Sequence, residues 1–137
     1  MFRRAFLIAF LLAGCQQLPL TPNDLQARKF EAVPDKSVIY VLRDNPDFTE
    51  QSATIFLGAD GTVTMYPGTY YRWVVAPGRN RIAGFGDDGG SFTLDTKAGA
   101  LYFVQQRLTP AGQSVFQSIS EPQARTIVAR CVLAGGQ

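Results

Sequence analysis

Between Ser37 and Ile119 the chain alternates short apolar and polar runs with turn residues, a pattern typical of β-strands. The strands that we predict cover residues 37–43, 52–58, 62–66, 69–75, 81–86, 91–96, 100–107 and 113–119. Turn dipeptides such as Asp60-Gly61 and Pro77-Gly78 separate them, because glycine accepts the positive φ that tight turns need. About seven to eight short antiparallel strands joined by such turns predict a sandwich or a barrel.

The strand at residues 69–75 alternates two sets of side chains. Tyr71, Trp73 and Val75 share one face, which we expect to point into the core. Tyr70 and Arg72 share the other face and are our candidates for a ligand or partner surface. The alternative is that these aromatic rings simply fill the sandwich, since each aromatic side chain buries a large area.

Two helices are predicted, one at each end of the strand region. Ser120 and Gln123 form a capping box, and apolar residues follow at 124, 127, 128, 131 and 132, the spacing of one helix face. We expect Gly135 to end this helix and its buried side to include Cys131. Upstream, Thr21 is placed to cap a short helix from Pro22 to about residue 30. It would lie within residues 15–36, interpreted as a spacer ahead of a single domain at 37–137.

The first residues have the layout of a secretion signal. Arg3 and Arg4 precede an apolar run over 5–13, which is too short for a transmembrane helix of about 20 residues. The run ends in Leu12-Ala13-Gly14-Cys15, which resembles the lipobox of bacterial lipoproteins. The resemblance implies a signal peptide at 1–14 and a mature protein that begins at a lipidated Cys15, which would carry three acyl chains. An Asp after that cysteine retains enterobacterial lipoproteins in the inner membrane, whereas this chain has Gln16. We therefore expect an outer-membrane anchor with the domain in the periplasm; the inner membrane and the cell surface are the alternatives.

Charge and cysteine content narrow the functional classes. Loss of Arg3 and Arg4 leaves 11 Lys and Arg against 11 Asp and Glu in the remaining 123 residues. A neutral chain lacks the electrostatic footprint of a nucleic-acid-binding protein, so that class is excluded. Lipidation of Cys15 would leave Cys131 without an intramolecular partner, and no disulfide is expected.

Several segments together resemble a known family. They are Lys29-Phe30, Pro34-Asp35-Lys36, Val38-Ile39-Tyr40-Val41 with Arg43, Tyr70 to Trp73 followed by Ala76-Pro77-Gly78, Ala98-Gly99 with Tyr102-Phe103-Val104, and Arg130-Cys131-Val132-Leu133-Ala134. In this order they resemble a bacterial lipoprotein family catalogued as a domain of unknown function and related to the PEGA-like β-domains of envelope proteins. The resemblance implies an immunoglobulin-like or transthyretin-like sandwich, and it implies no catalytic residues.

Candidate chemistry is sparse. The chain has no histidine, which removes the usual general base, the common triads and most zinc sites. Cys131 is predicted to be a core residue rather than a nucleophile. Asp87-Asp88, flanked by glycines, is more typical of a hairpin tip than of a calcium site or a carboxylate pair. We therefore expect that the protein is not an enzyme and that it binds no cofactor and no metal ion.

The sequence thus favours a structural or protein-interaction module of the cell envelope. It would bind the bilayer through lipid on Cys15 and an envelope protein through its β-faces or edge strands. A module that binds glycan or another small ligand is the alternative. Hydrolysis by two carboxylates roughly 5 to 10 Å apart in a cleft is a third hypothesis.

Overall fold

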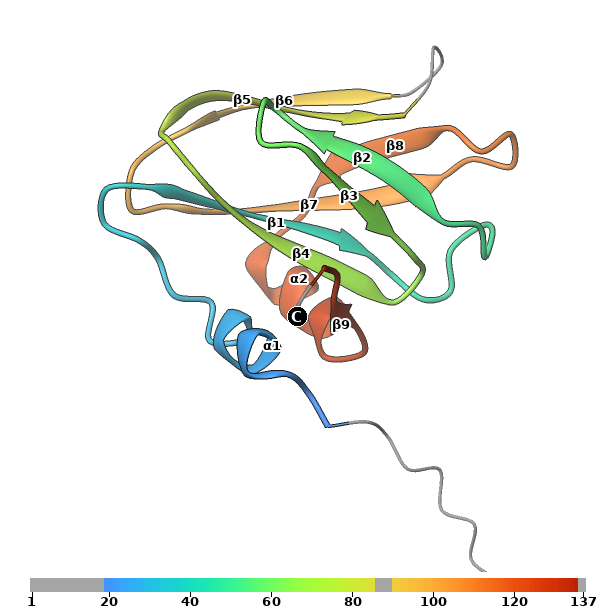
Figure 1. The fold of residues 1–137 in the computed structure, drawn as a ribbon, viewed down its shortest axis with the longest axis horizontal. Coiled ribbons are helices and arrows are strands. Elements are labelled where there is room, and N and C mark those ends of the chain that lie inside the picture. Colours follow the sequence, from blue (N-terminus) through green and yellow to red (C-terminus); the bar gives the residue numbers. More distant parts are fainter. Residues whose placement is uncertain (1–18, 86–89, 136–137) are drawn as a thin grey trace, which may run out of the picture.

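The computed structural model describes residues 19–85 and 90–135, which form a two-layer β-sandwich with both helices against one of its sheets (Figure 1). One sheet has the order β8-β7-β1-β4-β9, with β1 at Ser37–Arg43, β4 at Thr69–Val75, β7 at Leu101–Leu108, β8 at Ser114–Ser118 and β9 at Val132–Leu133. The other has the order β3-β2-β5-β6, with β2 at Ala53–Leu57, β3 at Thr62–Met65, β5 at Gly78–Gly84 and β6 at Ser91–Thr96. The helices are α1 at Pro22–Ala27 and α2 at Glu121–Val128. The predicted mainly β sandwich with a C-terminal helix is confirmed.

Strand direction differs from the antiparallel arrangement that we predicted. β1 pairs antiparallel with β4 but parallel with β7, and β4 pairs parallel with the short β9. Tight turns force neighbouring strands to be antiparallel. All four strands of the other sheet, and β4, lie between β1 and β7 in the sequence, so no turn imposes the relative direction of β1 and β7.

The central strand β1 is buried on both faces, and all seven of its residues are inaccessible to solvent. Ile39 and Val41 point into the core between the two sheets. Val38, Tyr40 and Leu42 point into a second core, which the two helices cover. A strand covered on both faces needs apolar residues at nearly every position, and the sequence Val-Ile-Tyr-Val-Leu meets that need.

The segment that we interpreted as a spacer belongs in part to the fold. Thr21 caps α1 as predicted, but α1 ends at Ala27 and packs on the outer face of the five-stranded sheet. Phe30 follows with a φ of 52° and stacks on Tyr40, with ring centroids 5.0 Å apart. The guanidinium of Arg125 in α2 also lies over the Phe30 ring, 4.3 Å from its centroid. Residues 21–30 therefore help to build the helix-side core, an outcome that the local pattern of prolines and charges did not indicate.

The C-terminal helix begins as predicted and ends earlier. Ser120 and Gln123 form the expected capping box. After Ala129 the chain turns back to form β9, so Val132 lies 52% exposed beside Thr69 instead of continuing the buried helix face. Cys131 is buried, as predicted.

Candidate functional site

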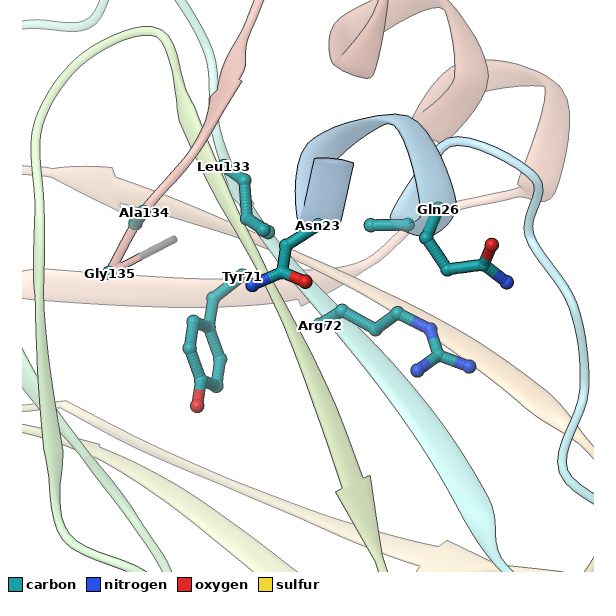
Figure 2. A pocket seen from close by; sticks show the side chains of 8 residues that line it. Asn23, Gln26, Tyr71, Arg72, Leu133, Ala134 and Gly135 are labelled. Atoms are coloured by element: carbon teal, nitrogen blue, oxygen red, sulfur yellow. The ribbon is translucent and has the colours of Figure 1, made fainter. Parts of the chain in front are cut away.

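A cavity of about 270 Å³ lies where α1 meets the exposed side of β4 and the end of β9 (Figure 2). Its lining combines two amides, a phenol, a guanidinium, one leucine side chain and small residues: Asn23, Gln26, Ala27, Tyr71, Arg72, Leu133, Ala134 and Gly135. In Figure 2, Asn23 of α1 reaches down between Tyr71 and Arg72, which extend to opposite sides of β4. The site therefore depends on how α1 and the last residues of the chain are held against β4.

A buried carboxylate holds these three segments together. Asp24 in α1 accepts hydrogen bonds from the Tyr70 hydroxyl at 2.5 Å and from the Leu133 main-chain N–H at 2.9 Å. The Nε of Arg28, one helical turn later, donates to the same carboxylate at 2.7 Å. Burial by itself would raise the pKa of Asp24, but these hydrogen bonds from Tyr70, Leu133 and Arg28 outweigh it and lower the pKa. The carboxylate is consequently ionised at neutral pH.

Arg28 extends the same network to the end of α2. Its Nη1 donates to the carbonyl of Val128 at 2.8 Å, and its Nη2 donates to the carbonyl of Cys131. These carbonyls lie at and just beyond the helix C-terminus, where the last carbonyls lack partners within the helix and a cation is favourable. Asp24 and Arg28 thereby hold α1 against β4, the last residues of the chain and the end of α2.

Arg72 is the cationic group of the cavity. Its Nη2 donates to the main-chain carbonyl of Glu31 at 3.0 Å, and no carboxylate of the described residues lies within ion-pair distance of it. The nearby carboxylate of Glu31 accepts instead from Gln26, at 3.0 Å. A guanidinium with spare donors beside amide side chains is suited to bind a carboxylate or another hydrogen-bond acceptor.

Of the two residues predicted to form a partner face, only Arg72 can do so. Tyr70 points the same way but is fully buried, and its hydroxyl is occupied by Asp24. Tyr70 is buried because α1 covers the start of β4, and the alternation of side chains along one strand cannot reveal such a tertiary contact. Burial and the adjacent carboxylate raise the pKa of Tyr70, so it stays protonated.

Other aromatic residues divide between core and surface. Trp73 is a core residue, as predicted, and its indole N–H donates to Asp60 at 2.7 Å. Phe56 and Phe85 instead stack on each other on the outer side of the four-stranded sheet, with centroids 5.9 Å apart, and are 40% and 72% exposed. Phe56 follows the core residue Ile55, so its outward direction agrees with strand alternation.

The candidate reactive groups are held in structural roles. Burial raises the pKa of Cys131 to about 11, which leaves the thiol protonated and unreactive at neutral pH. Cys15 and Asp87-Asp88 lie outside the described residues. In the part of the chain that the structure describes, no three potential ligands are grouped to hold a metal ion. No helix in that part is long and apolar enough to span a membrane.

Two carboxylates do line a second cavity, of about 340 Å³, but both are engaged by arginines. Asp44 accepts two hydrogen bonds of 2.6 Å from Arg130, which lower its pKa. Asp47 accepts from the buried Arg43 at 2.8 Å and from the main-chain N–H of Leu108 at 3.1 Å. A glycosidase needs one carboxyl group that is protonated at neutral pH. The bonds from Arg130 stabilise the carboxylate form of Asp44, which does not suit a general acid, and Asp47 is held in its own ion pair with Arg43.

Sequence reasoning missed the network that builds the cavity. The spacing of Asp24 and Arg28 at i and i+4 was the available signal, since such pairs face each other on a helix. Their roles depend on residues 46 to 109 positions away, such as Tyr70 and Leu133, which the local pattern cannot identify.

No family model matches the chain, and neither does any curated protein or solved structure.

Proposed function

We propose that this protein is a lipid-anchored envelope module without catalytic activity, which binds an envelope protein at the surface where α1 meets β4. The observation that carries the proposal is the cavity beside Arg72, whose guanidinium lacks an acidic partner among the described residues. The lipobox at Cys15 supports the anchor. The engagement of Cys131, Asp44 and Asp47 in structural contacts supports a binding role rather than a catalytic one.

The position of α1 supports the proposal that the surface where α1 meets β4 lies close to the bilayer. Six peptide units separate Cys15 from Thr21, the cap of α1, and they reach at most about 20 Å when fully extended. Because α1 is fastened to the domain through Asp24 and Arg28, the domain cannot move farther from a lipid on Cys15 than this short tether allows. The proposed partner is therefore a membrane protein or one that lies near the membrane surface.

Cross-linking in intact cells tests this function. A photoreactive amino acid would replace Gln26, which lines the cavity, and cross-linked proteins would be identified by mass spectrometry. We expect one reproducible partner, and we expect it to be lost when Cys15→Ser removes the anchor. The matched control carries the photoreactive residue at Val115, which is 50% exposed on β8. Equal cross-linking from both positions, or none from Gln26, would contradict the proposal.

Glycan binding is a second candidate, favoured by the exposed Phe56 and Phe85 pair. Thr54 and Thr64 lie on neighbouring strands of the same sheet, with their hydroxyls 3.1 Å apart. Aromatic faces can pack against sugar rings, while hydroxyl groups offer hydrogen bonds.

Sedimentation with purified peptidoglycan tests this second candidate. Phe56→Ala combined with Phe85→Ala should abolish co-sedimentation, whereas Val115→Ala, a change at another exposed apolar residue, should not. If the wild-type protein stays in the supernatant, the glycan hypothesis is wrong.

A further inference from the structure

The cavity lies at an open sheet edge, and the hydrogen bonds around it define that edge. The main-chain N–H of Ala134 donates to the carbonyl of Tyr70 at 2.7 Å, so Tyr70 directs its main-chain groups toward β9. Alternate residues of a strand direct these groups to the same side. Arg72 and Val74 therefore direct their N–H and C=O groups toward the side that β9 occupies next to Tyr70.

β9 covers only the first two residues of β4. The pairing consists of Thr69 with Val132 and Tyr70 with Leu133, and Gly135, with a φ of 62°, is not in an extended strand conformation. No described residue pairs with Arg72 or Val74 on this side. Within the described part of the chain, four main-chain groups of Arg72 and Val74, two donors and two acceptors, thus have no partner along an extended strand, which is the arrangement that accepts an added strand.

The positive charge of Arg72 beside this edge indicates which kind of segment would pair with β4. Side chains directly opposite each other on paired strands point to the same face of the sheet. A residue opposite Arg72 would therefore point to the helix side, toward the guanidinium that no carboxylate of the described residues neutralises. A second copy of this chain would bring another Arg72 to the same edge, and like charges are unfavourable there.

We infer that β4 binds an extended segment of the partner protein by β-strand addition at Arg72 and Val74, and that this segment carries an Asp or Glu opposite Arg72. The inference rests on the proposed function and names the chemistry of its partner. A residue opposite Val74, which is 40% exposed, would be apolar and cover that side chain. The cavity lined by Gln26 and Arg72 would receive the acidic side chain.

A peptide library displayed on phage, selected against the immobilised Cys15→Ser chain, provides the test. We expect enrichment of peptides with alternating apolar residues and one Asp or Glu. Val74→Pro removes one unpaired N–H without breaking a ladder bond to β1, a position where a sheet edge tolerates proline. It should weaken binding of the selected peptides by roughly tenfold, the effect of losing one main-chain hydrogen bond and its alignment. Val74→Thr keeps the N–H and is the matched control, which should bind as wild type does.

A second variant keeps the test decisive if Val74→Pro fails to fold. Arg72→Glu leaves the main-chain edge intact and should reverse the preference, so that selected peptides carry Lys or Arg in place of the acid. The inference would be overturned if the selected peptides bound Val74→Pro as tightly as wild type and Arg72→Glu selected the same acidic peptides. An absence of enriched peptides would also overturn it. A dimer of this chain that Val74→Pro dissociates would also overturn it, because the occupant would then be a second copy. If cells still yield an anchored partner that cross-links at Gln26 while Val74→Pro has no effect, the strand inference fails and the proposed function stands.

Discussion

Replacing Asp24 with asparagine probes the network that fastens α1 to the domain. The variant keeps the shape of the side chain but exchanges one carboxylate oxygen for an NH₂ group. That group would face either the N–H of Leu133 or the donors of Tyr70 and Arg28, so at least one buried donor loses its acceptor. An orphaned buried donor costs about 1 to 3 kcal/mol, and hydrogen bonds to a charged acceptor are worth about 1 kcal/mol more than neutral ones. We expect a loss of about 3 kcal/mol in the free energy of unfolding, and a fall in Tm of roughly 10 °C.

The pH dependence of this loss follows from the lowered pKa of Asp24. A carboxyl group with a pKa lower in the folded than in the unfolded chain stabilises the fold above the unfolded value of about 3.9, and this contribution disappears as the pH falls through the folded value. The difference between wild type and Asp24→Asn should thus be complete at pH 7 and shrink below about pH 4. Urea denaturation of the chain from residue 16 onward, followed by circular dichroism at pH 7 and at pH 3, measures it.

An exposed ion pair provides the matched control for Asp24. Asp95 contacts Arg79 at 3.3 Å, and both side chains are more than three-quarters exposed, so Asp95→Asn should change stability by less than about 0.5 kcal/mol. A similar effect of the two substitutions at pH 7 would refute the role assigned to the network, as would a loss at Asp24 that does not shrink in acid.

Three further substitutions or treatments have definite expected outcomes. Arg43→Ala leaves the carboxylate of Asp47 buried without its cation and should cost about 3 to 5 kcal/mol by urea denaturation, whereas an effect below 1 kcal/mol would contradict the buried pair. Gly90→Ala would place a Cβ 2.0 Å from the carbonyl oxygen of Ser114, so thermal unfolding should occur at a clearly lower temperature; unchanged Tm would mean that β6 and β8 are not this close. Cys131 should resist alkylation by iodoacetamide at pH 7.5 in the folded protein and react promptly in urea, and mass spectrometry would detect rapid modification of the native chain if its thiol were accessible.

The fold was more predictable than the site because strands and caps have local signals. The bounds of β1, β4 and β6 agree with the alternating pattern, and the Ser120 capping box lies where the sequence placed it. The parallel pairing of β1 with β7 has no such signal, since it joins segments more than 60 residues apart. The same limit explains Tyr70. Alternation assigns it correctly to the face of β4 opposite Trp73, but that face is covered by the helices at Tyr70 instead of being exposed.

For this protein, the sequence alone determined the sandwich, its turns and the absence of histidine, and it predicts the lipid anchor at Cys15 and a neutral mature chain. All of these depend on composition or on residues within one turn or strand of each other. Only the tertiary structure decided that α1 is part of the domain, that Tyr70 is hidden, and that Arg72 remains beside an open edge of β4. The first two outcomes depend on Asp24 accepting hydrogen bonds from Tyr70 and Leu133, which lie 46 and 109 positions away, because a buried carboxylate is stable only where donors converge on it.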